Sequence, residues 1–411
     1  MRAEVAIVGE GLAGSLAATV LGRAGYTTII VDPHDTYPDD FRCEKLEIGR
    51  VEMLDRLGVG GAVVRASTHM DEMWIARRGR LIDKRPFHQY GIAYQDLVNT
   101  VRAEIPPSVS KVRTWVTAIE PGAKTQRIHL KNGDSIEAKL TIIASGLNWT
   151  LRSGLGIKRE VSSPRHSISI GFDICRKDKA DFDFQALQYN PERVGDLLGY
   201  LTLFRIRQSM RANLFVYHDL KHPWIELLRN DPNAAVHTLM PGLSGLIGDY
   251  ELVDKPKIWP TDLHTMQDYV IPGVVLVGDA FGAACPATGT GTFKVFTDID
   301  RLCKVHVPKW MEGESLEAGR ILEFYRDSEK IKCDRLSHDM AYRFKSLAVD
   351  TTLPRQAERW ARFASRALIG QTRKYVHGFP AQQMAKARIV ESIAPVKTTE
   401  DSSEALRGAR A

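Results

Sequence analysis

The residues best suited to chemistry lie in one stretch, GVVLVGDAFGAACPATGTGTF, between Gly273 and Phe293. A short apolar run, typical of a buried strand, ends there in a single carboxylate, Asp279. Three more glycines, Gly282, Gly289 and Gly291, lie within ten positions of the chain that follows. A carboxylate at the end of a strand can accept hydrogen bonds without acid–base chemistry. The glycines let a bound group approach bare backbone N–H groups at the start of the helix predicted from Thr292.

A second glycine-rich turn lies near the N-terminus, in EVAIVGEGLAGSLAATVLGRAGYTTIIVD. An apolar strand over residues 5–8 is followed by G-x-G-x-x-G, a helix pattern, and a second strand that ends in Asp32. The glycines permit a tight turn and close approach of a pyrophosphate, which the helix N-terminus also favours. Asp32 stands 23 residues after Gly9, where a carboxylate accepts hydrogen bonds from an adenosine ribose. The unit predicts a dinucleotide bound at Gly9, Gly11, Leu12, Ala13, Gly14 and Asp32.

The remainder of the chain distinguishes FAD from NAD. A simple NAD domain would continue with strand–helix units, whereas this chain runs into a loop that carries Arg42 and then an amphipathic helix. Residues 111–146 follow later as a β-rich stretch with a hairpin signal at Asn132-Gly133. That stretch closes on an apolar strand over residues 140–144 and then Ser145-Gly146.

These elements, in this order, resemble the flavoprotein monooxygenases of the aromatic-hydroxylase type, the class A superfamily of para-hydroxybenzoate hydroxylase. The match covers residues 4–60, 90–160 and 260–305, nearly half of the chain. It implies an α/β fold in which a Rossmann-like FAD-binding domain carries an inserted mixed β-sheet for the substrate and a C-terminal helical region. The domains that we predict are residues 1–75, 91–155 and 260–335 for FAD, 76–90 and 156–259 for the substrate sheet, 336–394 for the helical region, and 395–411 for a disordered tail.

The resemblance also implies roles for individual residues. Arg42 would reach the pyrophosphate and the flavin side, and the helix that contains Gln95 would lie along the cofactor. Gly278 and Asp279 look like the second FAD motif, in which Asp279 binds a ribityl hydroxyl. The catalytic positions would be Pro286, against the isoalloxazine ring, and Gly289 and Gly291. The backbone N–H groups of these two glycines, with that of the cofactor-binding Thr290, would face the N1–C2=O edge, where reduced flavin carries negative charge.

The implied activity is that of a single-component FAD-dependent monooxygenase, which hydroxylates or epoxidises an electron-rich, aromatic small molecule. NADPH or NADH would reduce the flavin, oxygen would form a peroxide at its C4a carbon, and the terminal oxygen would pass to the substrate. The cofactor carries this chemistry while the protein positions and desolvates it. The mechanism requires no side-chain nucleophile and no metal, and the sequence contains no evident triad or metal-ligand cluster.

Departures from the family pattern keep other functions open. The family usually carries Asp-Gly where this chain has Ser145-Gly146, and a histidine after Gly-Asp-Ala-Ala where this chain has Phe281-Gly282. The lost carboxylate is implicated in nicotinamide handling, so the reductant is left open between NADPH and NADH. A reductase or dehydrogenase without oxygen insertion, a halogenase-related flavoenzyme, and a flavin-binding scaffold remain alternatives.

Three strand-like runs in the middle of the chain, residues 166–174, 199–206 and 212–218, are implied to form the substrate sheet, with a further strand from residues 76–90. Alternate residues of such strands face one side. The candidate pocket residues are Tyr200, Phe204, Phe215, Tyr217 and Phe281, each of which could instead belong to an ordinary core.

Composition bounds the setting. The chain of 411 residues is 44% hydrophobic and has no apolar run near the roughly 18 residues of a membrane span. The five cysteines include no CxxC pair, so we interpret them as free thiols. Because free thiols are typical of a reducing compartment, we expect a cytoplasmic protein. The net charge of +6 lies mainly after residue 340, which argues against a nucleic-acid groove across the whole chain.

The sequence LPRQAERWARFASRALIGQTRKYV predicts an amphipathic C-terminal helix. Its apolar positions are Trp360, Phe363, Ala364 and Ala367, and arginines flank them. We expect this helix to pack on the FAD-binding domain with its arginines solvated. Contact with a membrane surface, an acidic carrier protein or a second subunit is the alternative.

Overall fold

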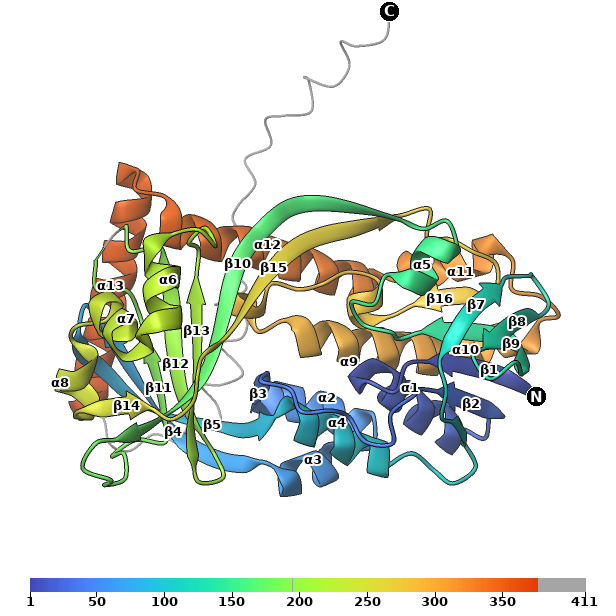
Figure 1. Cartoon of the computed structure of the whole chain (residues 1–411), viewed down its shortest axis with the longest axis horizontal. Helices are drawn as coiled ribbons and strands as arrows, with labels where there is room; N and C mark the ends of the chain where they lie inside the picture. Colours follow the sequence, from blue (N-terminus) through green and yellow to red (C-terminus); the bar gives the residue numbers. More distant parts are fainter. Residues whose placement is uncertain (194, 376–411) are drawn as a thin grey trace, which may run out of the picture.

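The computed structural model describes residues 1–193 and 195–375 and shows two β-sheets at opposite ends of an elongated molecule (Figure 1). The strands of the first sheet, in spatial order, are β6 (Ser110–Val112), β2 (Thr28–Val31), β1 (Arg2–Val8), β9 (Ser135–Ile143), β8 (Gln126–Leu130) and β7 (Val116–Glu120), with β16 (Val274–Leu276) paired to β9. The central pairs β2–β1, β1–β9 and β9–β16 are parallel. This sheet is the core of a Rossmann-like nucleotide-binding fold.

Both faces of the first sheet are buried, which explains why its central strands read as continuous apolar runs. Val5, Ile7 and Val275 point to a layer of helices. Those helices are α1 (Leu12–Arg23), α2 (Ile48–Arg56), α3 (Gly60–Ala66), α4 (Tyr94–Ala103), α9 (Gly291–Arg301), α10 (Val307–Glu312) and α11 (Ala318–Tyr325). The other face, with Ala6 and Val8, packs under the β7–β8 hairpin and the short helix α5 (Thr150–Gly154). The hairpin predicted at Asn132-Gly133 is present between β8 and β9, and Gly133 takes a positive φ of 90°.

The second sheet is larger and mixed. Its strands, in spatial order, are β14 (Tyr250–Leu252), β10 (Lys158–Arg176), β13 (Ser209–Val216), β12 (Leu198–Ile206), β11 (Ala186–Tyr189), β4 (Thr68–Arg77), β5 (Arg80–Ala93) and β3 (Cys43–Glu47), with β15 (Lys257–Gln267) paired to β10. Leu201, Leu203 and Leu214 on one face pack against α6 (Pro223–Asn230), α7 (Pro232–Leu239) and α8 (Leu243–Ile247). The opposite face is therefore the one that remains to meet the first domain.

Two long strands join the halves of the molecule. β10 has 19 residues and β15 has 11, and their pairing continues from Lys158↔Gln267 near the first sheet to Gly171↔Lys257 in the second. Figure 1 shows this pair arching from one sheet to the other. Its register shifts between Val161 and Ser167, where irregular pairing lets a strand bend.

The predicted mixed sheet is present, but it takes in residues that the predicted division gave to the FAD-binding domain. Residues 43–47, 68–75, 91–93 and 260–267 are strand residues of the second sheet. The reason is that β4 pairs along most of β5 while β3 pairs with the C-terminal end of β5, so the chain enters the second sheet earlier than a pattern search detects. The division into domains stays a prediction in other respects, and its segments 376–394 and 395–411 lie outside the described residues.

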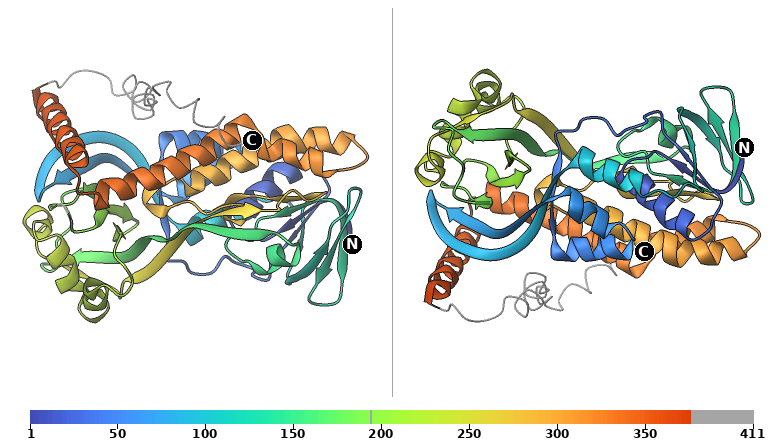
Figure 2. Two further views of the ribbon diagram at one scale, coloured as in Figure 1. Left: turned by 90° about the horizontal axis from the view of Figure 1, so that it is seen from above. Right: turned by 90° about the horizontal axis from the view of Figure 1, so that it is seen from below.

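Two helices end the described chain, α12 (Ser328–Val349) and α13 (Leu353–Tyr375). α12 runs lengthwise beside α9, as both views of Figure 2 show. α13 packs on β5 of the second sheet, so the expectation that it packs on the FAD-binding domain was wrong. Its predicted apolar stripe is divided, because Phe363 and Ala367 are partly covered whereas Trp360 and Ala364 are exposed. No helix of the described ranges is long and apolar enough to span a bilayer.

Candidate functional site: two glycine turns at one sheet edge

The two glycine-rich turns leave the same edge of the first sheet. Val8 at the end of β1 and Leu276 in β16 are both paired with Ile143, the last residue of β9. The turns therefore start only two strand spacings apart, about 10 Å. A Cβ added to Gly278 would lie 3.5 Å from the Cβ of Ala13, so the two motifs are in contact. The carboxyl ends of parallel strands are where nucleotides bind in open α/β sheets.

The glycines of these turns separate into two kinds. Gly9 has φ of 99°, and Cβ atoms at Gly9 and Gly14 would meet Ala144 O at 2.7 Å and Gly9 O at 1.8 Å. These two positions are fixed by packing inside the protein. A Cβ at Gly11, Gly289 or Gly291 would instead meet nothing within 4 Å. Those three glycines border open space from both motifs, as a cradle for one extended cofactor requires, and the arrangement fits FAD.

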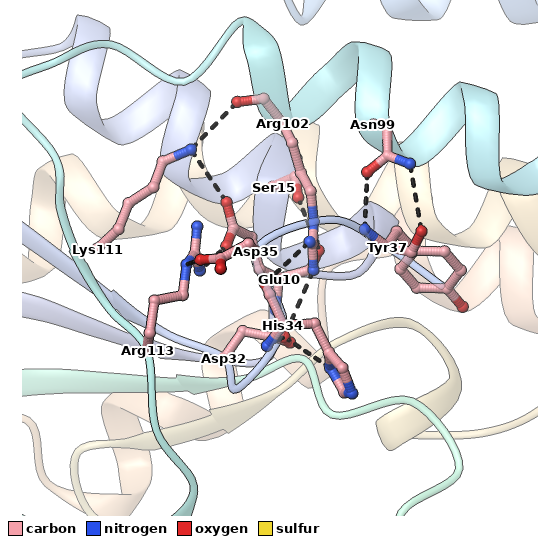
Figure 3. Close-up of polar contacts among 10 residues, drawn as sticks. All are labelled: Glu10, Ser15, Asp32, His34, Asp35, Tyr37, Asn99, Arg102, Lys111 and Arg113. Carbon is pink, nitrogen blue, oxygen red and sulfur yellow. Dashed lines mark hydrogen bonds and ion pairs between the residues drawn. The ribbon is translucent and has the colours of Figure 1, made fainter. Parts of the chain in front are cut away.

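Asp32 lies at the predicted adenosine end, where it already has partners. Its Oδ2 accepts the N–H of Glu10 at 2.8 Å, and its Oδ1 accepts the N–H of His34 at 2.9 Å. Arg102 of α4 reaches Asp32 at 3.5 Å and donates to the main-chain oxygen of Glu10 at 2.6 Å (Figure 3). Asp32 thus closes the glycine turn against β2, and the ribose contact predicted for it stays a prediction.

Glu10 is a buried charge that sequence reasoning missed. It occupies the first variable position of G-x-G-x-x-G, and its side chain is 0% exposed. Figure 3 shows its carboxylate between Lys111 and Arg113, with Lys111 Nζ at 3.1 Å. Buried carboxylates need such partners because desolvation is costly. The motif allows any residue at this position and therefore does not indicate a buried charge. The only indication in the sequence was the pair of cations Lys111 and Arg113.

The second turn is bracketed by Arg152. This buried guanidinium donates to the main-chain oxygens of Ala280 at 2.6 Å and of Asn148 at 2.9 Å. Burial lowers the pKa of Arg152 to about 10. Burial also raises the pKa of Asp279, which Arg42, Lys294 and Arg152 oppose. None of the hydrogen bonds formed by residues 1–193 and 195–375 ends on the Asp279 carboxylate, so its oxygens are available to a bound hydroxyl.

A network of buried ions holds this turn in place. Asp298 of α9 accepts the N–H of Gly278 at 2.9 Å and pairs with Lys330 of α12 at 2.8 Å. Lys330 also meets Asp334 at 3.2 Å, and Asp334 meets Lys294 at 3.0 Å. Burial alone would lower the pKa of Lys330, but the two aspartates hold it above the ordinary value. The loop between this turn and α9, residues 281–290, is called the flavin loop below. It is also held by α12, since the hydroxyls of Thr290 and Ser337 lie 2.7 Å apart.

The loop before β3 carries Arg42 and lies beside the same space. The guanidinium of Arg42 is bound by Asp40 and by the hydroxyl of Tyr37, and it stacks 4.1 Å over the ring of Tyr94. Gln95 accepts the N–H of Asp40 at 2.8 Å. Gln95 therefore orders the loop, while the direct cofactor contacts predicted for Arg42 and Gln95 stay predictions.

Strand β3 separates the two sides of the site, because its side chains alternate. Glu44 faces the second flavin motif, where Thr292 Oγ1 lies 3.5 Å away. Burial raises the pKa of Glu44 to about 7, against the opposing effect of Arg42 and Arg50. Cys43 points the other way and lies 3.3 Å from Asn213 of β13. Lys45, two residues further along the strand, points to the same side as Cys43.

Four of the five candidate pocket residues lie on the sheet face that meets the flavin motif. Tyr200 and Phe215 are cross-strand partners with ring centroids 4.9 Å apart, and Phe204 follows Tyr200 on the same face. The hydroxyl of Tyr200 donates to Ala287 O at 2.5 Å, directly beside Pro286. Tyr217 continues this face, and its buried hydroxyl has no partner among the described residues.

Phe281 is not with them. Its ring stacks on Tyr325 at 4.9 Å and lies edge-on to Tyr269. It also lines a separate cavity of about 270 Å³ between the loop, β15 and α12. The structure therefore does not bring Phe281 together with the other four residues.

Lys45 is a second charged residue that sequence reasoning missed. Its ammonium lies 5.6 Å from the ring centroid of Phe204, and the described part of the chain gives it no hydrogen-bond or ion-pair partner. Burial lowers the pKa of Lys45 to about 8, although Glu47 and Cys43 act in the opposite direction. The sequence CEKLE does not alternate in polarity as a strand usually does, so neither strand β3 nor the burial of Lys45 was predicted.

These features define a class of protein: a flavoprotein with a discontinuous Rossmann-like domain and a substrate sheet over its second cofactor motif. The sequence profile of the FAD binding domain family matches residues 2–305. The 3-demethoxyubiquinol 3-hydroxylase of Escherichia coli (strain K12) is 25% identical over 350 residues, which are 79% of this chain and 84% of that protein. The 6-hydroxynicotinate 3-monooxygenase of Bordetella bronchiseptica is 22% identical, over 82% of this chain and 91% of that protein.

A solved structure gives the same fold. The p-nitrophenol 4-monooxygenase PnpA of Pseudomonas putida DLL-E4 superposes with a TM-score of 0.72 at 17% identity, over 90% of this chain and 94% of that one. The chain belongs to the FAD binding domain family, and within it to the FAD-dependent class A monooxygenases of the para-hydroxybenzoate hydroxylase type. The family takes its electrons from NAD(P)H.

The ion network under the second turn should be sensitive to one side chain. We expect Lys330→Met to lower the free energy of unfolding by about 3–5 kcal/mol, because it leaves Asp298 and Asp334 without their shared cation. Lys332→Met is the matched control, since that side chain is 74% exposed and pairs only with Glu329. The control should lose less than about 0.5 kcal/mol. Equal losses in denaturant titrations of both variants would contradict this account.

The carboxyl group of Glu44 should make stability depend on pH. Its pKa is raised from 4.5 to about 7 on folding, so the folded state holds the proton more tightly. Stability is therefore greatest below the unfolded pKa and is lost as pH rises from 4.5 to about 7. Between about pH 5 and about pH 8, the wild type should lose about 1–3 kcal/mol more than Glu44→Gln in denaturant unfolding. Glu52→Gln, at an exposed position of α2, should behave as the wild type.

Proposed function

We propose that this monooxygenase holds an aromatic substrate between the flavin loop and the face of the second sheet opposite α6, α7 and α8, with Tyr200, Phe204, Phe215 and Tyr217 lining the substrate side. The observation that carries the proposal is the hydrogen bond from Tyr200 to Ala287 O, which fixes this sheet face against the loop that contains Pro286. Aromatic side chains suit an aromatic ring through stacked and edge-on contacts. FAD, when bound, supplies the chemistry by activating oxygen with electrons taken from NAD(P)H.

The residues of this chain would divide the remaining work. Gly11, Leu12, Ala13 and Gly14, at the start of α1, present backbone N–H groups to the pyrophosphate. Gly9 forms the turn before them, and its own N–H donates to Val31 O at 2.9 Å. Asp279 accepts a ribityl hydroxyl. The N–H of Gly291, at the start of α9, stabilises negative charge on the pyrimidine edge without an ionisable group that could titrate there. The N–H groups of Gly289 and Thr290, also predicted for this edge, donate to Pro286 O at 3.1 Å and to Thr288 Oγ1 at 3.3 Å, so they would have to exchange these partners.

The free ammonium of Lys45 favours a substrate with an acidic group. An unpaired cation beside the ring of Phe204 attracts a phenolate or a carboxylate, and deprotonation makes a phenol more electron-rich. Relatives of comparable length act, by their names, on a demethoxyubiquinol and on a hydroxynicotinate. We therefore place phenols and hydroxylated aromatic acids first among substrate classes.

The test is a screen of phenols and hydroxylated aromatic acids with the FAD-loaded protein, in which NADPH and NADH oxidation, oxygen uptake and product mass are followed together under ¹⁸O₂. We expect one labelled oxygen atom in the product and faster NAD(P)H oxidation when substrate is present. Turnover without label would identify a reductase or dehydrogenase, incorporation of halide would identify a halogenase, and bound flavin without turnover would identify a scaffold. Each of these three results would overturn the proposal.

Tyr200→Phe tests the contact between sheet and loop. Without the hydrogen bond to Ala287, we expect product formation per NADPH oxidised to fall severalfold while bound FAD is unchanged, because the substrate face shifts relative to the loop. Tyr250→Phe is the matched control, since the Tyr250 hydroxyl is buried without a hydrogen-bond partner in the part of the chain that the structure describes, and it lies on the helix-covered face. A Tyr200→Phe enzyme that couples as well as the control would contradict this role.

A further inference from the structure

Helix α13 presents an apolar stripe to solvent. The exposed positions recur at helical spacing along one side, and we call them the outward stripe: Leu353, Ala357, Trp360, Ala361, Ala364 and Leu368. The exposed fraction is 80% for Leu353, 51% for Trp360 and 64% for Leu368. Helices on globular proteins ordinarily turn such a stripe inward. The stripe therefore marks a surface for binding.

Polar contacts fix this orientation. Arg359 donates to Leu347 O at 2.8 Å and to Asp350 O, which caps the last carbonyls of α12. Glu358 of α13 pairs with Arg343 of α12 at 3.4 Å and, within its own helix, with Arg355 and Arg362 at 2.6 Å and 2.9 Å. The guanidinium of Arg78, in the β4–β5 turn, stacks 3.6 Å over the ring of Trp360. These contacts hold one side of α13 against α12 and the β4–β5 turn, so the helix cannot rotate its apolar stripe inward without breaking them.

The rim of the stripe is strongly basic. The turn residues 77–80 carry three arginines, and residues 353–369 carry four arginines and one glutamate, so seven minus one gives a net charge of +6. The whole chain also has a net charge of +6, so the remaining residues sum to zero. The pKa of Arg77 is lowered to about 10, by burial first and then by Arg366 and Arg362. An anion placed here would relieve that repulsion.

This charge selects among possible occupants. A second copy of the chain would set one +6 surface against another. The chain's own residues 376–411 carry five lysines and arginines against four acidic residues, a net charge of +1, and bring no complementary charge. An apolar stripe bordered by arginines matches the pattern of an interfacial helix, whose apolar side enters the acyl boundary while its cations meet anionic headgroups.

We propose that α13 is a membrane-surface docking helix, which binds anionic phospholipid through the outward stripe and its arginine rim. The enzyme would then lie on a bilayer by the outer side of its substrate sheet, because α13 packs on β5. Binding of this kind is reversible and falls with salt, since part of the attraction is electrostatic.

The experiment is co-sedimentation of the full-length, FAD-loaded enzyme with phosphatidylcholine vesicles that contain or lack roughly one third phosphatidylglycerol. We expect binding to the anionic vesicles, little binding to neutral ones, and weaker binding at about 0.5 M salt. The triple variant Leu353→Ser, Trp360→Ser, Leu368→Ser should bind the anionic vesicles at least about tenfold more weakly.

Trp259→Ser is the matched control, because Trp259 of β15 is also 51% exposed but lies away from α13. It should bind as the wild type does. Bound FAD and turnover, measured without vesicles, show that both variants are folded, and neither variant touches the cofactor site. The proposal fails if the wild type ignores anionic vesicles or if the triple variant binds as well as the control.

Two other results would assign the stripe elsewhere and overturn the proposal. If light scattering reveals a dimer that the triple variant abolishes, a second copy covers the stripe. Vesicle binding that appears only after deletion of residues 376–411 would make that segment the natural occupant.

Discussion

The parallel pairing of β1, β9 and β16 is the constraint on which the site depends. Gly9 and Gly278 are 269 positions apart in the chain, yet they follow strands that flank the same central strand. Two helices, α1 and α9, start from this one edge and direct their positive ends to the same side. One end suits a pyrophosphate and the other a reduced isoalloxazine, so a single sheet edge provides for both charged parts of FAD. Gly278 has a φ of 59°, and a Cβ there would lie 3.1 Å from Val295 of α9, so the second turn is closely packed where it starts.

Local patterns allowed much of this to be predicted. G-x-G-x-x-G, the hairpin at Asn132-Gly133 and the Gly-Asp turn depend on backbone geometry that only a few residue types can adopt, so they are legible in one sequence. Glu10 and the Lys330–Asp298 pair were not legible in the same way. Each depends on partners that the fold brings from 32 to more than 100 positions away, and a charge in the sequence does not state whether it will be buried.

The substrate side shows the same limit in another form. Alternation placed Tyr200, Phe204 and Phe215 on one face of their strands, and the structure has them there. Strand β3 went unnoticed because its residues include three charges, and it is a strand only through its backbone pairing with β5. Periodicity likewise identified α13 as amphipathic, but it could not tell which side would face the protein. That side was decided by arginine contacts to α12 and to the β4–β5 turn.

The substrate face and the cofactor side meet at several points, and this has a consequence for catalysis. The second turn is fixed by buried ions on α9 and α12, and the substrate sheet meets the loop after it through the hydrogen bond from Tyr200 to Ala287 O and the 3.4 Å contact between Ser167 Oγ and Cys285 Sγ. Irregular pairing between Val161 and Ser167 lets the long strands bend on their way from one sheet to the other. The contacts at Tyr200 and Ser167 then set where the substrate face stands relative to that loop. Because near-attack geometry is sensitive to displacements of about 1 Å, the hydrogen bond from Tyr200 to the residue after Pro286 holds the substrate face where its position matters most for the proposed reaction.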